Sequence, residues 1–221
     1  MSYNIAIDGP AGAGKSTIAK KIAKELSYIY VDTGAMYRAM ALFFIRQGIR
    51  PEETEKINQA CQQADITISY QDGEQMVMLN GENVNGFIRT EEVGNMASAT
   101  SVNQNVRVKM VELQQQLAKT TDVIMDGRDI GTKVLPDAVL KIYLTASSRI
   151  RAERRYKELQ EKQVDCDLET IEKDIVDRDY RDMHRENSPL MQAEDAILVD
   201  SSNMSIDEAV KTIIDLFQER V

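Results

Sequence analysis

The chain has 221 residues, of which 43% are hydrophobic and 29% are charged. This length is sufficient for one full-sized hydrophobic core and a small appended subdomain. The formal net charge of -9 argues against a nucleic-acid binder, because phosphate backbones are held mainly by clustered Lys and Arg. Arginines nevertheless concentrate at residues 149–155 and 178–185. A basic pocket in an acidic protein favours a small anionic ligand, and neither a nucleic acid nor a membrane is expected as a partner.

The sequence predicts a cytoplasmic protein. Its two cysteines, Cys61 and Cys166, lie far apart without the spacing of a metal site, and we expect free thiols in a reducing compartment. The N-terminal residues lack the basic segment and apolar stretch of a signal peptide. No run of 18 apolar residues occurs, so no membrane span is expected. Nothing in the sequence requires more than a monomer.

Short apolar runs that alternate with helical patterns predict a doubly wound α/β fold with five parallel strands. Strands are expected at residues 4–7, 29–31, 123–125, 139–144 and 196–199, and helices at residues 15–26, 35–47, 91–119, 147–160, 168–185 and 206–219. The last helix is preceded by a capping box, since Ser205 stands three residues before Glu208.

Residues 63–90 depart from this rhythm and predict a small antiparallel three-stranded insertion. Ile66, Ile68 and Tyr70 alternate with polar residues. Asp72-Gly73 and Asn80-Gly81 then separate short runs, and both dipeptides are strong hairpin signals.

The segment between the first strand and the first helix matches the phosphate-binding pattern GxxxxGK[ST] in full. Its residues are Gly9, Pro10, Ala11, Gly12, Ala13, Gly14, Lys15 and Ser16. Glycines let the backbone approach an anion closely, and the helix N-terminus that follows favours negative charge. We expect this loop, together with Thr17, to bind ATP. Lys15 would reach the β- and γ-phosphates, and the Ser16 hydroxyl would ligate Mg²⁺.

Such a loop serves GTPase switches, ATPase motors and small-molecule kinases. The chain has neither the Asp-x-x-Gly switch element nor the Asn-Lys-x-Asp base reader of a GTPase. It is also short for a motor with partner-binding domains. These observations favour a small-molecule kinase.

Two further segments favour a kinase because they follow strand ends, where ligands bind in parallel α/β sheets. Residues 32–38 end in Arg38, whose guanidinium can form a fork on a phosphate. Residues 126–131 begin with Asp126, which either orders Mg²⁺ or caps the turn after its strand. Arg128 and Asp129 offer a phosphate anchor and a hydrogen-bond acceptor for a base.

Taken together, the three segments resemble those of bacterial cytidylate kinases. The resemblance runs nearly end to end and includes the insertion, an Arg-rich lid and the stretch from Arg178 to Arg185. Adenylate kinase, the nearest alternative within the fold, usually has a longer lid and lacks this insertion. The resemblance implies one kinase domain over residues 1–221, with residues 63–90 in the monophosphate-binding region and residues 147–162 as the lid. It also implies Mg²⁺-dependent transfer of the γ-phosphoryl group of ATP to CMP or dCMP.

The resemblance assigns roles to individual residues. Those implied to bind CMP are Thr33, Arg38, Ser98, Arg107, Arg128, Asp129, Arg178, Asp182 and Arg185. Those implied in catalysis are Lys15, Arg128, Arg151, Arg154 and Arg155, and those near the metal are Ser16 and Asp126. Family members often carry Ser at the position of Thr33, and either hydroxyl can serve.

The implied roles divide by the parts of the substrate. Arg38 and Arg128 would hold the α-phosphate of CMP. The ring would be read by Ser98, Arg107 and Asp129, because Arg can donate to O2 and N3 and Asp can accept from the N4 amine, a pattern that uracil inverts. Asp182 and Arg178 would face the ribose, Arg185 would lie near the phosphates, and the lid arginines would act on the transferring group.

Other interpretations stay open at this point. Arg107 lies on a long polar helix, where a charged side chain is usually exposed to solvent. His184, the only histidine, is expected at the surface. The acceptor could be UMP, AMP or a non-nucleotide. A nucleotide-sensing regulator and a binding-only module are the alternatives outside enzymes, although the intact Lys15 and Ser16 argue against the latter.

Overall fold

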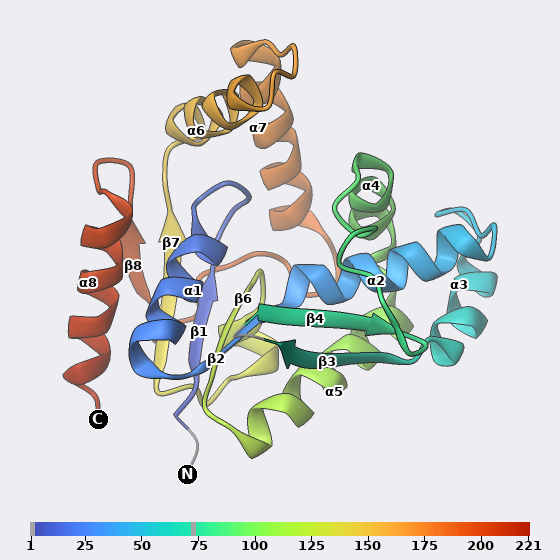
Figure 1. The fold of residues 1–221 in the computed structure, drawn as a ribbon, viewed down its shortest axis with the longest axis horizontal. Helices are drawn as coiled ribbons and strands as arrows, with labels where there is room; N and C mark the ends of the chain where they lie inside the picture. Colours follow the sequence, from blue (N-terminus) through green and yellow to red (C-terminus); the bar gives the residue numbers. More distant parts are fainter. Residues whose placement is uncertain (1–2, 72–73) are drawn as a thin grey trace. The chain divides into compact units, whose positions relative to one another are not determined.

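The computed structural model describes residues 3–71 and 74–221. It divides into two compact units. The first combines residues 1–30 with residues 121–221, and the second consists of residues 31–120. The chain therefore leaves the first unit within its second strand and returns to it before the strand that begins at residue 123 (Figure 1).

A five-stranded sheet in the order β2-β6-β1-β7-β8 forms the centre of the fold. Its strands are β1 (Ile5–Asp8), β2 (Ile29–Asp32), β6 (Val123–Gly127), β7 (Leu140–Thr145) and β8 (Ile197–Asp200). Strand β1 pairs in parallel with both β6 and β7, so that its Ile5 faces Ile124 on one side and Leu140 on the other. Each strand thus ends at the same edge of the sheet, which is where the phosphate loop begins.

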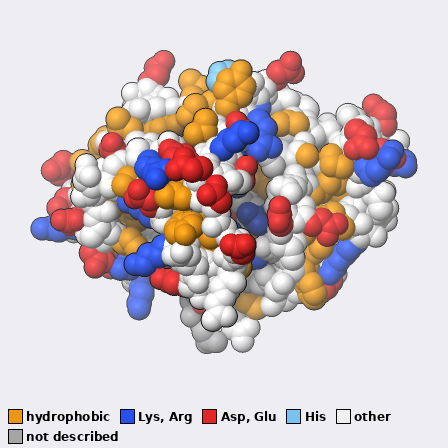
Figure 2. All heavy atoms as spheres, turned by 90° about the horizontal axis from the view of Figure 1, so that it is seen from above, with side chains coloured by type: hydrophobic (Ala, Val, Ile, Leu, Met, Phe, Trp, Pro, Cys, Tyr) orange, Lys and Arg blue, Asp and Glu red, His pale blue; other side chains and the backbone are white. Residues whose placement is uncertain are grey.

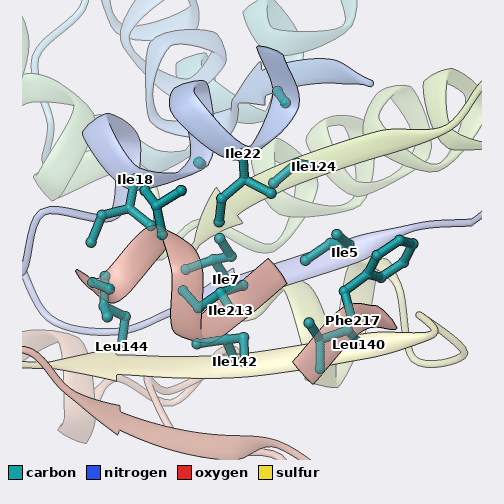
Figure 3. Close-up of a cluster of buried hydrophobic side chains, with 14 of the residues drawn as sticks. Ile5, Ile7, Ile18, Ile22, Ile124, Leu140, Ile142, Leu144, Ile213 and Phe217 are labelled. Carbon is teal, nitrogen blue, oxygen red and sulfur yellow. The ribbon is translucent and has the colours of Figure 1, made fainter. Parts of the chain in front are cut away.

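Helices α1 (Lys15–Leu26) and α8 (Ile206–Gln218) lie side by side against one face of this sheet (Figure 1). Figure 3 shows their apolar side chains meeting those of the strands, with Ile18 and Ile22 from α1, Ile213 from α8 and Ile7 from β1. Burying a side chain of this size stabilises the fold by about 1.5–3 kcal/mol. The predicted capping box is confirmed by hydrogen bonds between Ser205 and Glu208.

The remaining elements of the first unit follow β6 and β7. A short π-helix, η2 (Ile130–Val134), comes after β6. Helices α6 (Ser148–Glu161) and α7 (Leu168–His184) come after β7 and pack against each other. The arginines of α6 and the polar residues of α7 therefore belong to one pair of packed helices.

The second unit contains four helices and a three-stranded sheet within its described residues. The helices are α2 (Thr33–Arg46), α3 (Thr54–Ala60), α4 (Glu91–Thr100) and α5 (Gln104–Thr120), with the 3-10 helix η1 (Cys61–Gln63). The strands β3 (Ile66–Gln71), β4 (Glu74–Leu79) and β5 (Glu82–Asn83) are antiparallel in that order. Asn80 and Gly81 both have positive φ, as a tight two-residue hairpin requires. The Asp72-Gly73 turn lies outside the described residues.

The α/β architecture and all five parallel strands are confirmed, but two helix predictions were wrong in detail and one helix was missed. The expected helix over residues 91–119 is two helices, because Asn103 interrupts it and accepts hydrogen bonds from the backbone of Asn105 and Val106. Helix α2 begins two residues earlier than expected, because the Asp32 side chain caps it by accepting from Ala35 N at 2.9 Å. Helix α3 was not predicted.

Candidate active site

The phosphate loop joins β1 to α1 and depends on its glycines. Gly9, Gly12 and Gly14 have φ values of 148°, 76° and 89°, which side-chain-bearing residues rarely adopt. A Cβ on Gly9 would stand 1.9 Å from the Leu144 carbonyl oxygen of β7. Gly14 is the N-cap of α1 and no side chain caps that helix. The N-terminus of α1 is therefore available to an anion, as the fold of a phosphate site requires.

Lys15, the first residue of α1, is buried beside the loop. Its ammonium group donates to the Pro10 carbonyl oxygen at 2.7 Å. Burial, and then the positive charge of Arg128, lower the pKa of Lys15 to about 7, against the opposing pull of Asp126 and Asp8. A phosphate placed beside this ammonium group would restore its charge.

Ser16 and Asp126 lie together at the base of the loop. The Ser16 hydroxyl donates to Asp126 Oδ2 at 2.9 Å, and the Tyr30 hydroxyl donates to Asp126 Oδ1 at 2.7 Å. Among residues 3–71 and 74–221, no group of three or more His, Cys, Asp or Glu side chains is arranged to hold a metal. One carboxylate and one hydroxyl nevertheless fit Mg²⁺, which usually keeps several waters and shares phosphate oxygens.

A cavity of about 670 Å³ opens along the loop within the first unit. Besides the loop, it is lined by α6 and by the segment that leads from β8 into α8. The lining residues are Gly12, Ala13, Gly14, Lys15, Ser16, Thr17, Ile18, Arg151, Arg154, Arg155, Glu158, Ser201, Met204, Ser205, Ile206 and Ala209. The sequence analysis did not find the wall formed by residues 201–209, because no motif marks it.

The three lid arginines occupy different environments around this cavity. Arg151 is buried, donates to the Ala11 carbonyl oxygen of the loop at 2.8 Å and forms an ion pair with Asp179 of α7. Arg154 donates to the Ser201 carbonyl oxygen at 2.7 Å. Arg155 is exposed, and among the described residues it pairs only with Glu158, three residues further along α6. Arg151 thus fastens the lid helices to the loop, whereas Arg155 is held only by a solvent-exposed pair.

Five of the residues implied to bind the acceptor belong to the first unit, and three of them, all arginines, act on Asp182. Arg128 Nε donates to Asp182 Oδ2 at 2.8 Å. Burial alone would raise the pKa of Asp182, but the charges of Arg128, Arg178 and Arg185 outweigh it and lower the pKa. Arg185 also lies 4.0 Å from the buried carboxylate of Asp129. The structure therefore brings these five residues into one cluster of opposite charges.

Asp8, at the end of β1, holds the segment that carries two of these residues. Its carboxylate accepts from Ile130 N at 2.8 Å and from Gly131 N at 2.7 Å. Burial raises the pKa of Asp8 to about 6 in spite of these hydrogen bonds. The sequence offered a signal for this residue, because Asp8 follows a short apolar run just as Asp126 does.

In the second unit, Thr33 and Arg38 lie on the first turns of α2. Thr33 is buried, and Arg38 donates to the Ile88 carbonyl oxygen at 3.2 Å. Burial, and then the nearby charge of Arg89, lower the pKa of Arg38. Arg89 itself pairs with Asp32 at 2.7 Å. The two arginines lie close enough for their charges to interact, and only Arg38 was predicted as a site residue.

Arg107 and Ser98 also belong to the second unit. Arg107 is only 5% exposed. This contradicts the alternative interpretation that it is a solvent-exposed charge on a polar helix. Its guanidinium donates to the Ser101 carbonyl oxygen at 3.2 Å and lies 5.7 Å from the ring centroid of Tyr37. The half-buried Ser98 precedes that carbonyl by three residues and accepts from the Ser101 hydroxyl at 3.1 Å. A buried guanidinium beside an aromatic ring suits recognition of a planar ligand.

The family model for cytidylate kinase matches residues 5–219 of this chain. A cytidylate kinase from Caldicellulosiruptor saccharolyticus is 52% identical over 214 residues, covering 97% of this chain and 95% of that protein. This chain belongs to the cytidylate kinase family. The cytidylate kinase of Lactobacillus johnsonii is 50% identical over 216 residues, covering 98% of this chain and 94% of that protein.

A comparison of folds agrees with the α/β architecture. The crystal structure of an uncharacterized protein from Eubacterium ventriosum superposes with a TM-score of 0.56 at 13% identity, covering 99% of this chain and 100% of that chain. At this identity the similarity concerns the fold alone.

Family membership confirms the expectation of a nucleoside monophosphate kinase that acts on CMP or dCMP with ATP. It decides against a GTPase switch, a motor and a binding-only module. None of the helices in the described part of the chain is long and apolar enough to cross a membrane.

The only histidine has no place in this cytidylate kinase site. His184 is exposed and stacks on Tyr180 with ring centroids 4.0 Å apart, and Figure 2 shows acidic and basic side chains intermingled over the face that it draws. Phosphoryl transfer depends on positioning and charge neutralisation rather than on a histidine base.

Proposed function

We propose that this chain transfers the γ-phosphoryl group of ATP to CMP or dCMP in an in-line, Mg²⁺-dependent reaction, with ADP and CDP or dCDP as products. The observation that carries the proposal is the phosphate loop with its buried Lys15 and its Ser16–Asp126 pair, in a chain of the cytidylate kinase family. We take a monomer in the cytoplasm as the working form.

The donor side of the reaction is assigned to the loop and to the lid. The uncapped N-terminus of α1 and Lys15 would bind the β- and γ-phosphates of ATP. Mg²⁺, held by Ser16 and Asp126 and by phosphate oxygens, would neutralise charge on those phosphates. Residues 147–162 would act as the lid, because their helix already borders the cavity. Arg155, held only by an exposed pair, is free to turn toward a transferring phosphoryl group.

The acceptor side is assigned to the two arginine clusters. Arg38 and Arg128 would hold the α-phosphate of CMP, and Arg178, Asp182 and Arg185 the ribose and phosphates. Arg128 and Arg185 are already partly buried and paired with carboxylates in the free protein. They therefore lose little further hydration when the phosphate of the substrate binds beside them. Residues 63–90 would belong to the monophosphate-binding region.

The cytosine ring is assigned to Arg107, Asp129 and Ser98. The buried guanidinium would donate to O2 and N3, and the Asp129 carboxylate would accept from the N4 amine. A site built to hydrogen-bond a polar group rejects an analogue that inverts the pattern, because its own buried groups are left unpaired.

A coupled ADP-release assay with Mg-ATP and each of CMP, dCMP, UMP, AMP and GMP tests the reaction. We expect fast turnover with CMP and dCMP and little with the others. Turnover with a different nucleotide would support a kinase activity but contradict the base-reading roles of Arg107, Asp129 and Ser98. Slow ATP hydrolysis that none of the five accelerates would contradict the proposed function.

The Asp129→Ala variant separates base reading from donor binding. We expect kcat/KM for CMP to fall by about 100-fold or more, while the affinity for ATP stays within about twofold. Asp137→Ala is the matched control, because Asp137 is exposed in the same unit. Equal losses in CMP turnover and ATP affinity would show that Asp129 does not read the base.

A further inference from the structure

Tyr30 lies in β2 with a buried phenol ring, 8% exposed. Its hydroxyl donates to Asp126 Oδ1 at 2.7 Å, across 96 residues of sequence. The Ser16 hydroxyl donates to the other oxygen, Oδ2, at 2.9 Å. Each oxygen of this carboxylate is therefore held by a hydroxyl from a different element of the first unit, β2 on one side and α1 on the other.

These two hydrogen bonds are not equivalent for the chemistry of the site. The Ser16 hydroxyl is itself a ligand of Mg²⁺ in the proposed function, so its oxygen would serve both the metal and the hydrogen bond to Asp126. Tyr30 has no such second task. Its ring is fixed by the strand and by burial, and the Lys20 ammonium group lies 5.6 Å from the ring centroid. Tyr30 is the hydrogen-bond donor to Asp126 that would not also ligate the metal.

A carboxylate binds a metal well only when its plane is oriented so that its free lone pairs point toward the metal. Groups that hydrogen-bond to a ligating carboxylate supply this orientation, and their loss typically weakens metal binding by about 10–100-fold. A hydroxyl on Oδ1 fixes the plane of the Asp126 carboxylate and leaves Oδ2 directed at Ser16 and the loop.

We propose that Tyr30 is a positioning residue for the metal site, which fixes the Asp126 carboxylate toward Mg²⁺ without touching substrate. This inference rests on the proposed function, since it takes Ser16 and Asp126 as the groups near Mg²⁺. Tyr30 is not part of any phosphate-binding motif, and β6 separates its strand from β1, which leads into the loop.

The test uses Tyr30→Phe, which removes the hydroxyl and keeps the ring. Binding of a fluorescent ADP analogue is titrated with Mg²⁺, and separately in EDTA without metal. We expect the Mg²⁺ concentration for half-maximal tightening to rise by about 10-fold in Tyr30→Phe, while the affinity without metal stays within about twofold. Tyr28→Phe is the matched control, because Tyr28 enters the same strand but packs edge-on against Phe217. It should titrate as the wild type does.

Tyr30→Leu lacks the hydroxyl as well and serves as the second variant if Tyr30→Phe folds poorly. A wild-type Mg²⁺ titration in either folded variant would overturn the proposal and assign Tyr30 to the core alone. Equal weakening of ADP binding with and without Mg²⁺ would overturn it too. Failure of the proposed function would instead appear in the wild-type protein, as CMP turnover or ADP binding that does not respond to Mg²⁺.

Discussion

Binding of ADP should draw a proton from the solvent at pH 8, because Lys15 is largely uncharged in the free protein. Its pKa is lowered to about 7, first by burial and then by the charge of Arg128. About nine-tenths of the Lys15 side chains are then unprotonated at pH 8, and about one-tenth at pH 6. The phosphates of ADP favour the charged ammonium group and raise its pKa.

The predicted uptake is therefore about 0.9 proton per ADP bound at pH 8, when Lys15 becomes fully charged in the complex. At this pH the phosphate groups of ADP are already ionised, since their last pKa lies near 6. Asp8 is also ionised there, because its pKa is about 6. Neither group then obscures the contribution of Lys15.

Isothermal titration calorimetry measures this uptake in two buffers that differ in enthalpy of ionisation. The difference in observed binding enthalpy, divided by the difference in ionisation enthalpy, gives the number of protons. Lys15→Arg is the matched control, because an arginine stays charged at every working pH. We expect its uptake to be close to zero. Equal binding enthalpies in both buffers for the wild type at pH 8 would refute the reasoning and show a fully charged Lys15 in the free protein.

Three further predictions concern stability. Asp8 has its pKa raised from 3.8 to about 6 by burial, so the folded state binds its proton more tightly. Relative to Asp8→Asn, urea denaturation of the wild type should show a loss of stability of about 3 kcal/mol as pH rises from about 3 to about 7, of which about 2 kcal/mol falls between pH 4 and 6. A parallel pH dependence in both proteins would contradict this. Gly9→Ala should unfold well below the wild-type temperature in calorimetry, because its Cβ would stand 1.9 Å from a carbonyl oxygen of β7. Gly48→Ala, with φ of 65° but nothing within 4 Å of its Cβ, isolates the cost of φ alone, and equal losses would exclude the clash as the cause. Lys109 donates to three backbone carbonyls of residues 61–64, and Lys109→Met should cost about 1.5–3 kcal/mol in urea denaturation. A loss below about 0.5 kcal/mol would show that these bonds only replace those with water.

Local sequence patterns were sufficient for the elements that form the core. The strands are short and rich in Val, Ile and Leu, and the helices between them carry apolar residues at helical spacing, so each element is determined by its own residues. The phosphate loop is determined in the same way, because its glycines, Lys15 and Ser16 are contiguous. The turn at Asn80 and Gly81 is another example, since Asn tolerates positive φ and Gly, which lacks a Cβ, adopts it readily.

The break between α4 and α5 could not be predicted, because its cause lies elsewhere in the chain. Asn103 caps α5 while its amide donates to Asn58 at 2.9 Å, a residue of α3 that is 45 positions away. Helix α3 is itself short, and short helices draw little stability from their own sequence. Periodicity cannot report a contact of this kind.

The sequence by itself determined the fold class, the phosphate loop and, through its three motifs, the family. Only the tertiary structure decided how charges are paired around that loop. Arg151, expected to act on the transferring phosphate, is buried against the Ala11 carbonyl oxygen and Asp179. Tyr30, which no motif marks, holds Asp126. The physical reason is the same in both cases: a motif records which groups are neighbours along the chain, whereas burial and hydrogen bonding depend on groups that folding brings together from distant positions.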